Sequence, residues 1–472
     1  MMAKRHIVGF SIVLALMSFI PVMAQQSHTL FLMHELPQSA YVNPAIQPKC
    51  KWFIGLPALS SLYANVSSTG ISYSDFSRNE EYIDGEAIAR KLHSIDYLTS
   101  ELHLNLISLG YKRKDFYYFF NIAEKADAKV FYPRSIVNLA VYGNDDIVGE
   151  KMFTKGLGAY GIHYREYSLG IAQDFESYFL WGLRAKLLFG KANLTTRHGA
   201  ISLITEQNTY NLLAEWSYQL NSSLPLELPA NSNRFDIDSI GLAEVDVMQY
   251  MLNPNNVGFA IDYGFVFVDD EITWSASILD FGFVSWRSDV HKFKNNGSLA
   301  FEGITVDDIL NPDEFLDMIR DSLNNQILVT HSQGSYLTML PTKVNVGATY
   351  EFHPHFNAGV LLRTEFYPRR PVPSLTLSIN TVRLNNFSGS LSYSIMNGTF
   401  NNLGLGLGFG IQNMVFHVLS DNVIGFFSPH KAHTANLRFG VHFQFGCSEK
   451  SKRLPYKGPG CYWDPKNKER KK

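Results

Sequence analysis

The chain has 472 residues, of which only 18% are charged, and its formal net charge at pH 7 is −2. A soluble enzyme usually carries a charge on about a quarter of its residues. The near-neutral charge balance gives no reason to expect a nucleic acid as a partner. Aromatic residues make up 14% of the chain, which suits strands that are apolar on one face only.

The chain begins with a segment that is typical of exported proteins. Lys4 and Arg5 precede an apolar or small-residue run over 7–20, and small residues stand before Gln25. This pattern predicts a signal peptide over residues 1–24. A membrane anchor is the alternative, but the run is shorter than the roughly 20 residues that a spanning helix needs. No comparable run follows, so a mature chain placed in a membrane would have to be a barrel.

From about residue 101 onward, long stretches alternate apolar residues with polar or small ones. The clearest examples span residues 257–268, 344–352, 356–363 and 403–411. Such alternation predicts strands with one apolar and one polar face, although a soluble β-sandwich also shows it. The predicted strands are about 9–11 residues long and carry aromatic residues near their ends, as membrane-crossing strands do.

We therefore predict an all-β fold over residues 25–446, a transmembrane antiparallel β-barrel of about 14 strands with short helical insertions. The sheet has to close, because lipid cannot satisfy the backbone groups of an open edge. The predicted location is the cell outer membrane, with its lipid as a partner. The last strand, 437–445, matches the terminal pattern that barrel-assembly machinery recognises, so that machinery is also a predicted partner.

Three segments depart from the alternation and predict short helices with apolar stripes. We expect these stripes to pack over or into a barrel mouth as partial plugs. An equal alternative is that the helices are short insertions in surface loops that close nothing. The first helix is capped by Asp84 and carries Ile88, Leu92 and Ile95; the second lies within 240–252; the third starts at Asn311 and Pro312.

The end of the chain has its own composition. Residues 448–472 carry nine Lys or Arg against three acidic residues, and we predict a basic periplasmic tail over 447–472. The tail is either a solvated extension or a contact to anionic envelope material or an acidic partner protein. Export to an oxidising compartment favours a disulfide, and the short spacing makes Cys447 and Cys461 the candidate pair, leaving Cys50 free.

No arrangement in the sequence predicts catalytic residues, a cofactor or a metal site. Residues 331–335 lack the first glycine of a nucleophile elbow, and His353 with His355 alone makes a poor metal site. We therefore predict that the protein is not an enzyme. Several charged or polar residues should point into the lumen, where they form a salt-bridge lattice or line a solute path: Asp262, Glu351, Arg363, Arg438 and His442.

Several short phrases resemble those of known barrel families. Residues 39–45, Ser-Ala-Tyr-Val-Asn-Pro-Ala, resemble the NPA signature of PorP/SprF-like barrels, which are linked to type IX secretion and gliding. Residues 256–264, 277–282 and 419–423 resemble phrases of PorV-like and FadL-like barrels. The mature chain looks like an uncharacterised domain-of-unknown-function family in that superfamily. The resemblance implies a barrel whose N-terminal segment enters the lumen, and it carries over no ligand-binding residue.

Two hypotheses about function follow. The first is a non-enzymatic barrel that serves as an accessory or scaffold in an envelope complex, such as one associated with type IX secretion, with envelope proteins as partners. The second is a FadL-like channel for small hydrophobic solutes. A continuous apolar internal pocket with a lateral opening would favour the channel. A filled lumen with an exposed apolar docking patch outside the lipid belt would favour the scaffold. An enzymatic barrel is a more distant third alternative.

Overall fold

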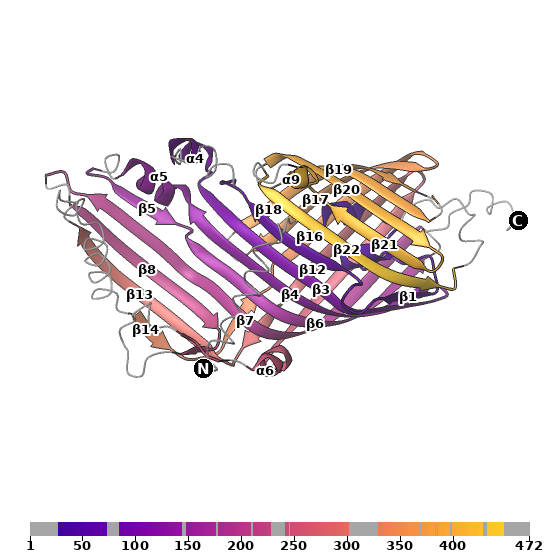
Figure 1. Cartoon of the computed structure of the whole chain (residues 1–472), viewed down its shortest axis with the longest axis horizontal. Helices are drawn as coiled ribbons and strands as arrows, with labels where there is room; N and C mark the ends of the chain where they lie inside the picture. The colour runs from indigo at the N-terminus through magenta and orange to yellow at the C-terminus, as the bar shows by residue number, and fades with distance from the viewer. Residues whose placement is uncertain are drawn as a thin grey trace, which may run out of the picture.

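Twenty strands form one antiparallel sheet that closes on itself into a barrel (Figure 1). Closure occurs where the last strand, β22 (Thr434–Phe445), pairs with β1 (Trp52–Gly55) and β2 (Leu62–Ser68). The computed structural model describes residues 27–72, 85–143, 148–175, 178–208, 211–227, 241–244, 246–301, 329–367, 370–382, 384, 386–396, 399–427 and 432–447.

The barrel wall has 14 strand positions, which confirms the predicted fold. β1 and β2 share the first position. The positions that follow are β3 (Ile95–Arg113), β4 (Phe116–Pro133), β6 (Gly158–Phe175), β7 (Phe179–Thr205), β11 (Asn256–Asp269), β12 (Ile272–Trp286), β15 (Tyr336–Met339) with β16 (Thr342–His353), β17 (Phe356–Tyr367), β18 (Arg370–Thr381), β19 (Phe387–Met396), β20 (Thr399–Ile411), β21 (Met414–Ser420) and β22.

Alternation along the strands gives the wall two different faces. In β11 every second residue is buried and every other one is exposed. Phe259 is 46% exposed on the outer face, whereas its neighbour Ala260 and the nearby Asp262 are fully buried on the inner face. An outer band of apolar side chains around a polar interior is the arrangement of a membrane barrel.

The two ends of the barrel differ in their connections. At one end, which we call the short-turn end, two-residue turns join β3 to β4, β11 to β12 and β20 to β21. Lys114, Asp270 and Gln412 adopt positive φ at the first turn position, as tight hairpin turns require. The opposite, long-loop end carries α4 (Gly85–Lys91), α5 (Arg134–Tyr142) and α9 (Ile424–Phe427) (Figure 1).

A panel of strands extends the wall beyond the long-loop end. β7 pairs with β11 along its first half and with β8 (Leu212–Ser223) from Asn193 onward. β8 pairs in turn with β13 (Val290–Phe301), and β13 with β14 (Val329–Ser332). β5 (Lys151–Lys155) pairs with the other side of β7. This panel is visible at the left of Figure 1.

The helical insertions agree only in part with the predictions. In α4 Ile88 is buried as expected, but Ile95 begins β3, and Asp84 lies outside the described residues. Within 240–252, only α6 (Val247–Leu252) is helical, with Asp246 as its N-cap. Residues 241–242 form β10 (Gly241–Leu242), which pairs with β9 (Leu226–Glu227).

The expected burial of the second helix is wrong, because no residue of α6 is buried and Val247 and Met248 are exposed. Tyr250 holds this helix to the barrel through a 2.7 Å hydrogen bond with His163 Nδ1, so its apolar stripe stays uncovered. The helix predicted at Asn311 and the signal peptide over 1–24 lie outside the described residues. Within the part that is described, no helix has the length and apolar character needed to cross a membrane.

A disulfide closes the seam between the first and last strands. Trp52 pairs with Phe445, and the same register places Cys50 opposite Cys447, two residues beyond each strand end. The two cysteines are bonded to each other. The predicted pairing of Cys447 with Cys461 is therefore wrong; Cys461, like the tail over 448–472, lies outside the described residues. Barrel closure brings together cysteines that are 397 residues apart, which spacing along the chain does not reveal.

Replacing both Cys50 and Cys447 with serine should lower the temperature at which the folded barrel loses its fast gel migration. Cross-links that close long loops typically contribute about 2–4 kcal/mol. A heat-modifiability gel with and without reductant measures the loss. Reductant should affect the wild type and leave the double variant unchanged; equal unfolding temperatures for oxidised wild type and variant would contradict a stabilising role.

Candidate functional site

The segment over residues 27–50, which we call the plug, lies inside the barrel. It contains α2 (His28–Leu32) and the 3-10 helix η1 (Pro37–Tyr41), and every residue of α2 is buried. Its contacts come from strands on several sides of the lumen. Thr29 hydrogen-bonds Ser392 of β19 at 2.8 Å, and Arg184 of β7 donates to the carbonyl oxygen of Ala40 at 3.2 Å. The plug is therefore held across the lumen.

Glycines on the inner face of β20 make room for the plug. The alternation of this strand sends its large apolar side chains outward and leaves glycine inward. A Cβ atom at Gly406 would lie 2.3 Å from Met33 Sδ, and one at Gly408 would lie 2.8 Å from Leu36 Cδ2. Larger residues at these positions would occupy the space that the plug fills.

A second pair of glycines forms a seat for residues 43–45, Asn-Pro-Ala. Gly182 of β7 and Gly264 of β11 are register partners on neighbouring strands. A Cβ at Gly182 would lie 2.2 Å from the Pro44 carbonyl oxygen, and one at Gly264 would lie 2.1 Å from Asn43 Oδ1. Asn43 Oδ1 also accepts from the Ala45 backbone N–H at 3.1 Å, which closes a local turn. In this chain the NPA phrase is thus the part of the plug that docks on the wall.

The plug histidines are neutral. Burial, with the nearby charge of Arg363, lowers the pKa of His28 to about 3, and burial lowers the pKa of His34 to about 4. His28 Nδ1 hydrogen-bonds Thr376 Oγ1 at 2.7 Å. Mild acidification to about pH 5 therefore leaves both side chains uncharged.

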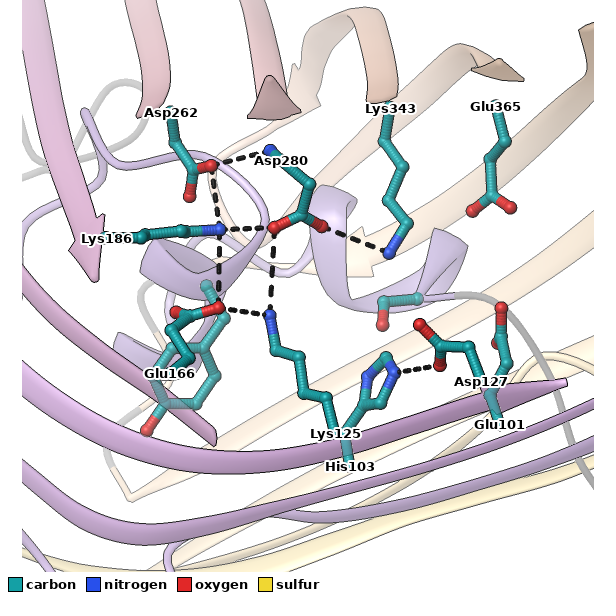
Figure 2. Close-up of polar contacts among 12 residues, drawn as sticks. Glu101, His103, Lys125, Asp127, Glu166, Lys186, Asp262, Asp280, Lys343 and Glu365 are labelled. Carbon is teal, nitrogen blue, oxygen red and sulfur yellow. Dashed lines mark hydrogen bonds and ion pairs between the residues drawn. The ribbon is translucent and has the colours of Figure 1, made fainter. Parts of the chain in front are cut away.

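Beside the plug, charged side chains from six strands meet on the inner wall (Figure 2). Lys186 of β7 lies at the centre, with Nζ 2.8 Å from Asp262, 2.5 Å from Asp280 and 3.7 Å from Glu166. We call this group the charge cluster; it comprises Lys125, Glu166, Arg184, Lys186, Asp262, Asp280 and Lys343.

A β-bulge in β12 places one member of the charge cluster. Leu279 and Asp280 are consecutive residues, yet both are buried on the inner face. Asp280 adopts φ 57°, a left-handed conformation that Asp tolerates, and its N–H donates to Asp262 Oδ1 at 2.7 Å. The bulge re-aims the Asp280 carboxylate inward, where it also lies 3.2 Å from Lys343.

Most residues predicted to face the lumen are buried there. Asp262 belongs to the charge cluster, Arg363 pairs with Glu365 at 2.6 Å, and Arg438 donates to Ser27 of the plug at 2.8 Å. His442 is fully buried and accepts from Gln38 of the plug at 2.7 Å. Glu351 is the exception, because it lies half-buried beside the irregular end of the β16–β17 hairpin.

Sequence reasoning missed six of the seven members of the charge cluster: Lys125, Glu166, Arg184, Lys186, Asp280 and Lys343. The sequence did hold a signal for Lys186. The alternation of β7 places apolar residues on the outer face and Lys186 on the inner face. An inward lysine in a buried wall requires carboxylate partners, but these come from other strands. Across the described residues, no group of three or more His, Cys, Asp or Glu has the geometry to hold a metal ion.

A cavity of about 80 Å³ lies between part of the charge cluster and the plug, and it is lined by Tyr41, Tyr63, Glu101, Lys125, Arg363 and Arg438 among others. A polar space of this size can hold several water molecules. The interior between plug and wall is therefore polar at this depth.

Nearer the long-loop end the interior becomes aromatic. Lys129 is buried among these rings, with Nζ 3.6 Å from the ring centroid of Tyr367 and 3.9 Å from that of Tyr97. We call this group the aromatic cluster; its rings belong to Tyr97, Phe131, Tyr160, Tyr164, Trp286, Tyr336 and Tyr367.

The barrel wall is interrupted between β1 and β2. Residues 56–61, which we call the wall break, form a loop in the first strand position, with Ala58 at φ 60°. Leu59 on the outer side is 46% exposed. Backbone hydrogen bonds hold the loop on both sides. Leu56 N–H donates to the Val441 carbonyl oxygen of β22 at 3.2 Å, and Val441 N–H donates to the Leu59 carbonyl oxygen at 2.8 Å. On the side of β3, Ala58 N–H donates to the Leu106 carbonyl oxygen at 3.1 Å, and Asn105 N–H donates to the Ser61 carbonyl oxygen at 3.0 Å.

Polar side chains close the wall break from inside. Ser60 hydrogen-bonds Ser108 at 2.9 Å, and Arg438 donates to Ser61 at 2.8 Å. Tyr41 of the plug hydrogen-bonds Ser108 at 2.8 Å. The plug therefore takes part in closing the wall as well as the lumen.

No curated protein matches the chain. Among solved structures, it is similar to the toluene transporter TbuX of Ralstonia pickettii (8% identity, 90% of this chain and 99% of that one, TM-score 0.41). It is also similar to a FadL homologue of Pseudomonas aeruginosa (10% identity, 90% and 100%, TM-score 0.35) and to the Pseudomonas putida toluene transporter TodX (6% identity, 86% and 91%, TM-score 0.36). A family of unknown function, DUF5723, matches residues 44–421, most of the chain, and the protein therefore belongs to that family.

Proposed function

We propose that the protein is an outer-membrane channel for small, mainly apolar organic solutes, and that its own plug holds it closed. This is the second of the two hypotheses drawn from the sequence. The observation that carries it is the wall break, whose inner side is closed in part by Tyr41 of the plug. We place the short-turn end in the periplasm and the long-loop end outside, as is usual for such barrels.

The axial route through the barrel is blocked at the short-turn end. The plug is buried there and contacts inward side chains on several sides of the lumen. A solute that enters from the long-loop end first meets the aromatic cluster. The rings of this cluster are buried against one another, so a solute that passes this level would have to part them and would then contact their apolar faces.

The wall break supplies a lateral route. Its outer residues, such as Leu59, are apolar and exposed on the face that contacts lipid, so a solute leaving here would enter hydrocarbon. For this route to open, the backbone hydrogen bonds of the loop to β22 and β3 would have to break, together with the contacts of Ser60 and Tyr41 with Ser108. Movement of the plug would break the Tyr41 contact, which couples plug displacement to opening of the wall.

By the criteria given with the two hypotheses, the wall break favours the channel, whereas the filled lumen and the uncovered apolar stripe of α6 favour the accessory or scaffold role. None of the proteins reported above as similar is a secretion component, and the likeness of residues 39–45 to PorP/SprF-like barrels remains a prediction. Residues 43–45 of this phrase dock on Gly182 and Gly264. Contact within the chain therefore explains why these residue types stand there, and no partner protein is needed.

Locking the wall break should stop uptake. Ser60 Oγ and Ser108 Oγ are 2.9 Å apart, so the S60C/S108C variant should form a disulfide across the break. In cells that carry the oxidised variant in the outer membrane, we expect the initial uptake rate of radiolabelled naphthalene to fall to that of cells without the protein. Reductant should restore it.

Wild-type cells with and without reductant are the control, because reductant also opens the bond between Cys50 and Cys447. Each single variant, S60C or S108C, should transport as the wild type does. Full uptake by the cross-linked variant would rule out the lateral route, and no protein-dependent uptake in the wild type would overturn the proposed function.

A further inference from the structure

A pocket opens at the long-loop end of the barrel, where β3 begins and β4 ends. Its volume is about 590 Å³, within the usual range for small-molecule sites. We call it the entrance pocket. α5 and β5 complete its walls, and its lining includes Ile95, Arg134, Asn138, Phe153 and Lys155.

The entrance pocket is positively charged. Arg134 and Lys155 line it, and none of the described residues in its lining is acidic. Neither cation forms an ion pair with another described residue. Nε of Arg134 and Oδ1 of Asn138 are buried without a hydrogen-bond partner in the described part of the chain. The unpaired Arg134 Nε is a donor beside two cations and indicates a site for a negatively charged group, whereas Asn138 Oδ1 is an acceptor that needs a donor from the same ligand or from water.

The entrance pocket adjoins the aromatic cluster. Ile95 lines the pocket and also packs against that cluster, in which Lys129 lies between the rings of Tyr97 and Tyr367. Six cations and four carboxylates line the cavity beside the plug, and Asp262, which lies behind this lining, pairs with Arg184 and Lys186. Its lining holds Lys125, Arg184, Lys186, Lys343, Arg363 and Arg438 against Glu101, Glu166, Asp280 and Glu365. Positive side chains therefore recur along the interior from the entrance inward.

We infer that the solute is an organic anion with an aromatic body, of the class of monoaromatic carboxylates. This inference rests on the proposed function and specifies its substrate class. Because hydrocarbon excludes an ionised carboxylate, such a solute would leave through the wall break in its protonated form. The aromatic body gains contact with Phe153 and then with the aromatic cluster, while the carboxylate binds Arg134 and Lys155. A neutral aromatic solute gains only the first of these contributions, and an aromatic cation is repelled by the same side chains.

Equilibrium dialysis of the refolded full-length protein with benzoate, benzyl alcohol and benzylamine tests the inference. The wild type should bind benzoate at least about tenfold more tightly than the neutral benzyl alcohol, since a hydrogen bond to a charged group contributes that much. Benzylamine should bind most weakly. The R134Q/K155Q variant should lose the preference for benzoate and keep its affinity for benzyl alcohol. K294Q, an exposed lysine on the panel, is the matched control and should behave as the wild type.

The gel shift shows whether R134Q/K155Q has folded, and the single variants R134Q and K155Q provide independent tests. Equal binding of benzoate and benzyl alcohol by the wild type, or unchanged benzoate binding by the folded double variant, would overturn the inference. If the inference fails but the oxidised S60C/S108C variant still blocks naphthalene uptake, the proposed function stands without it. If neither aromatic probe binds and naphthalene uptake is absent, the proposed function fails as well.

Discussion

Replacing Gly182 with valine should displace the plug and open a steady ion conductance. A Cβ at this position would lie 2.2 Å from the carbonyl oxygen of Pro44 and 2.6 Å from the backbone nitrogen of Ala45. These are backbone atoms, so no change of rotamer in the plug can relieve the overlap, and the docked segment has to move away. Planar-bilayer recordings of the refolded variant measure the conductance, while the wild type should show no steady open state.

Gly161→Val is the matched control, because a Cβ at Gly161 would lie 3.8 Å from its nearest neighbour. It should fold and stay closed. The heat-modifiability gel establishes that Gly182→Val has formed a barrel, and Gly264→Val, which overlaps Asn43 of the same seat, should reproduce the conductance. A folded Gly182→Val protein that stays as closed as the wild type would mean that the docked 43–45 segment does not hold the lumen shut.

The Asp262→Asn variant should be strongly destabilised. Asp262 is fully buried, forms an ion pair with Arg184 and lies 2.8 Å from Lys186 Nζ, and it also accepts from the Asp280 N–H. Neutralising it leaves two buried cations with less compensating charge. Removing one partner of a buried pair typically costs about 3–5 kcal/mol. The urea concentration at which half of the protein loses its fast gel migration measures this loss.

Glu215→Gln supplies the control for charge removal at an exposed position. Glu215 pairs with Lys151 on the panel, where both side chains are largely in solvent, so the midpoint should hardly change. An Asp262→Asn protein with the wild-type midpoint would show that the charge cluster contributes little to folding. A similar loss in both variants would point to a general effect of charge instead.

The carboxylate preference and the plug can be examined together. If the solute displaces the plug, benzoate should raise the conductance of the wild type and have little effect on Gly182→Val, in which the plug is already displaced. The wall-break variant S60C/S108C separates the two routes, because it locks the lateral path and leaves the glycine seat untouched.

The sequence by itself determined the strands and their neighbours. The alternation over 344–352 and 356–363 predicts β16 and β17, and a two-residue turn pairs them directly, so the information is local. The same holds for the outward apolar face of β11, since period-two alternation sets which side chains meet lipid. Strand length and spacing were enough to predict the number of strands and the closed barrel.

The resemblance in sequence implied that the N-terminal segment enters the lumen, but tertiary structure alone decided how that segment is seated and where the wall is joined. Cys50 meets Cys447 because the first strand pairs with the last, and the register of that pairing is set by closure of the whole sheet. Asp280 faces inward because of a bulge, which shifts the alternation by one residue without a distinct mark in the sequence. The plug is seated where Gly182 and Gly264 meet residues 43–45. Period-two patterning does not predict this contact, because it describes only the two faces of a single strand.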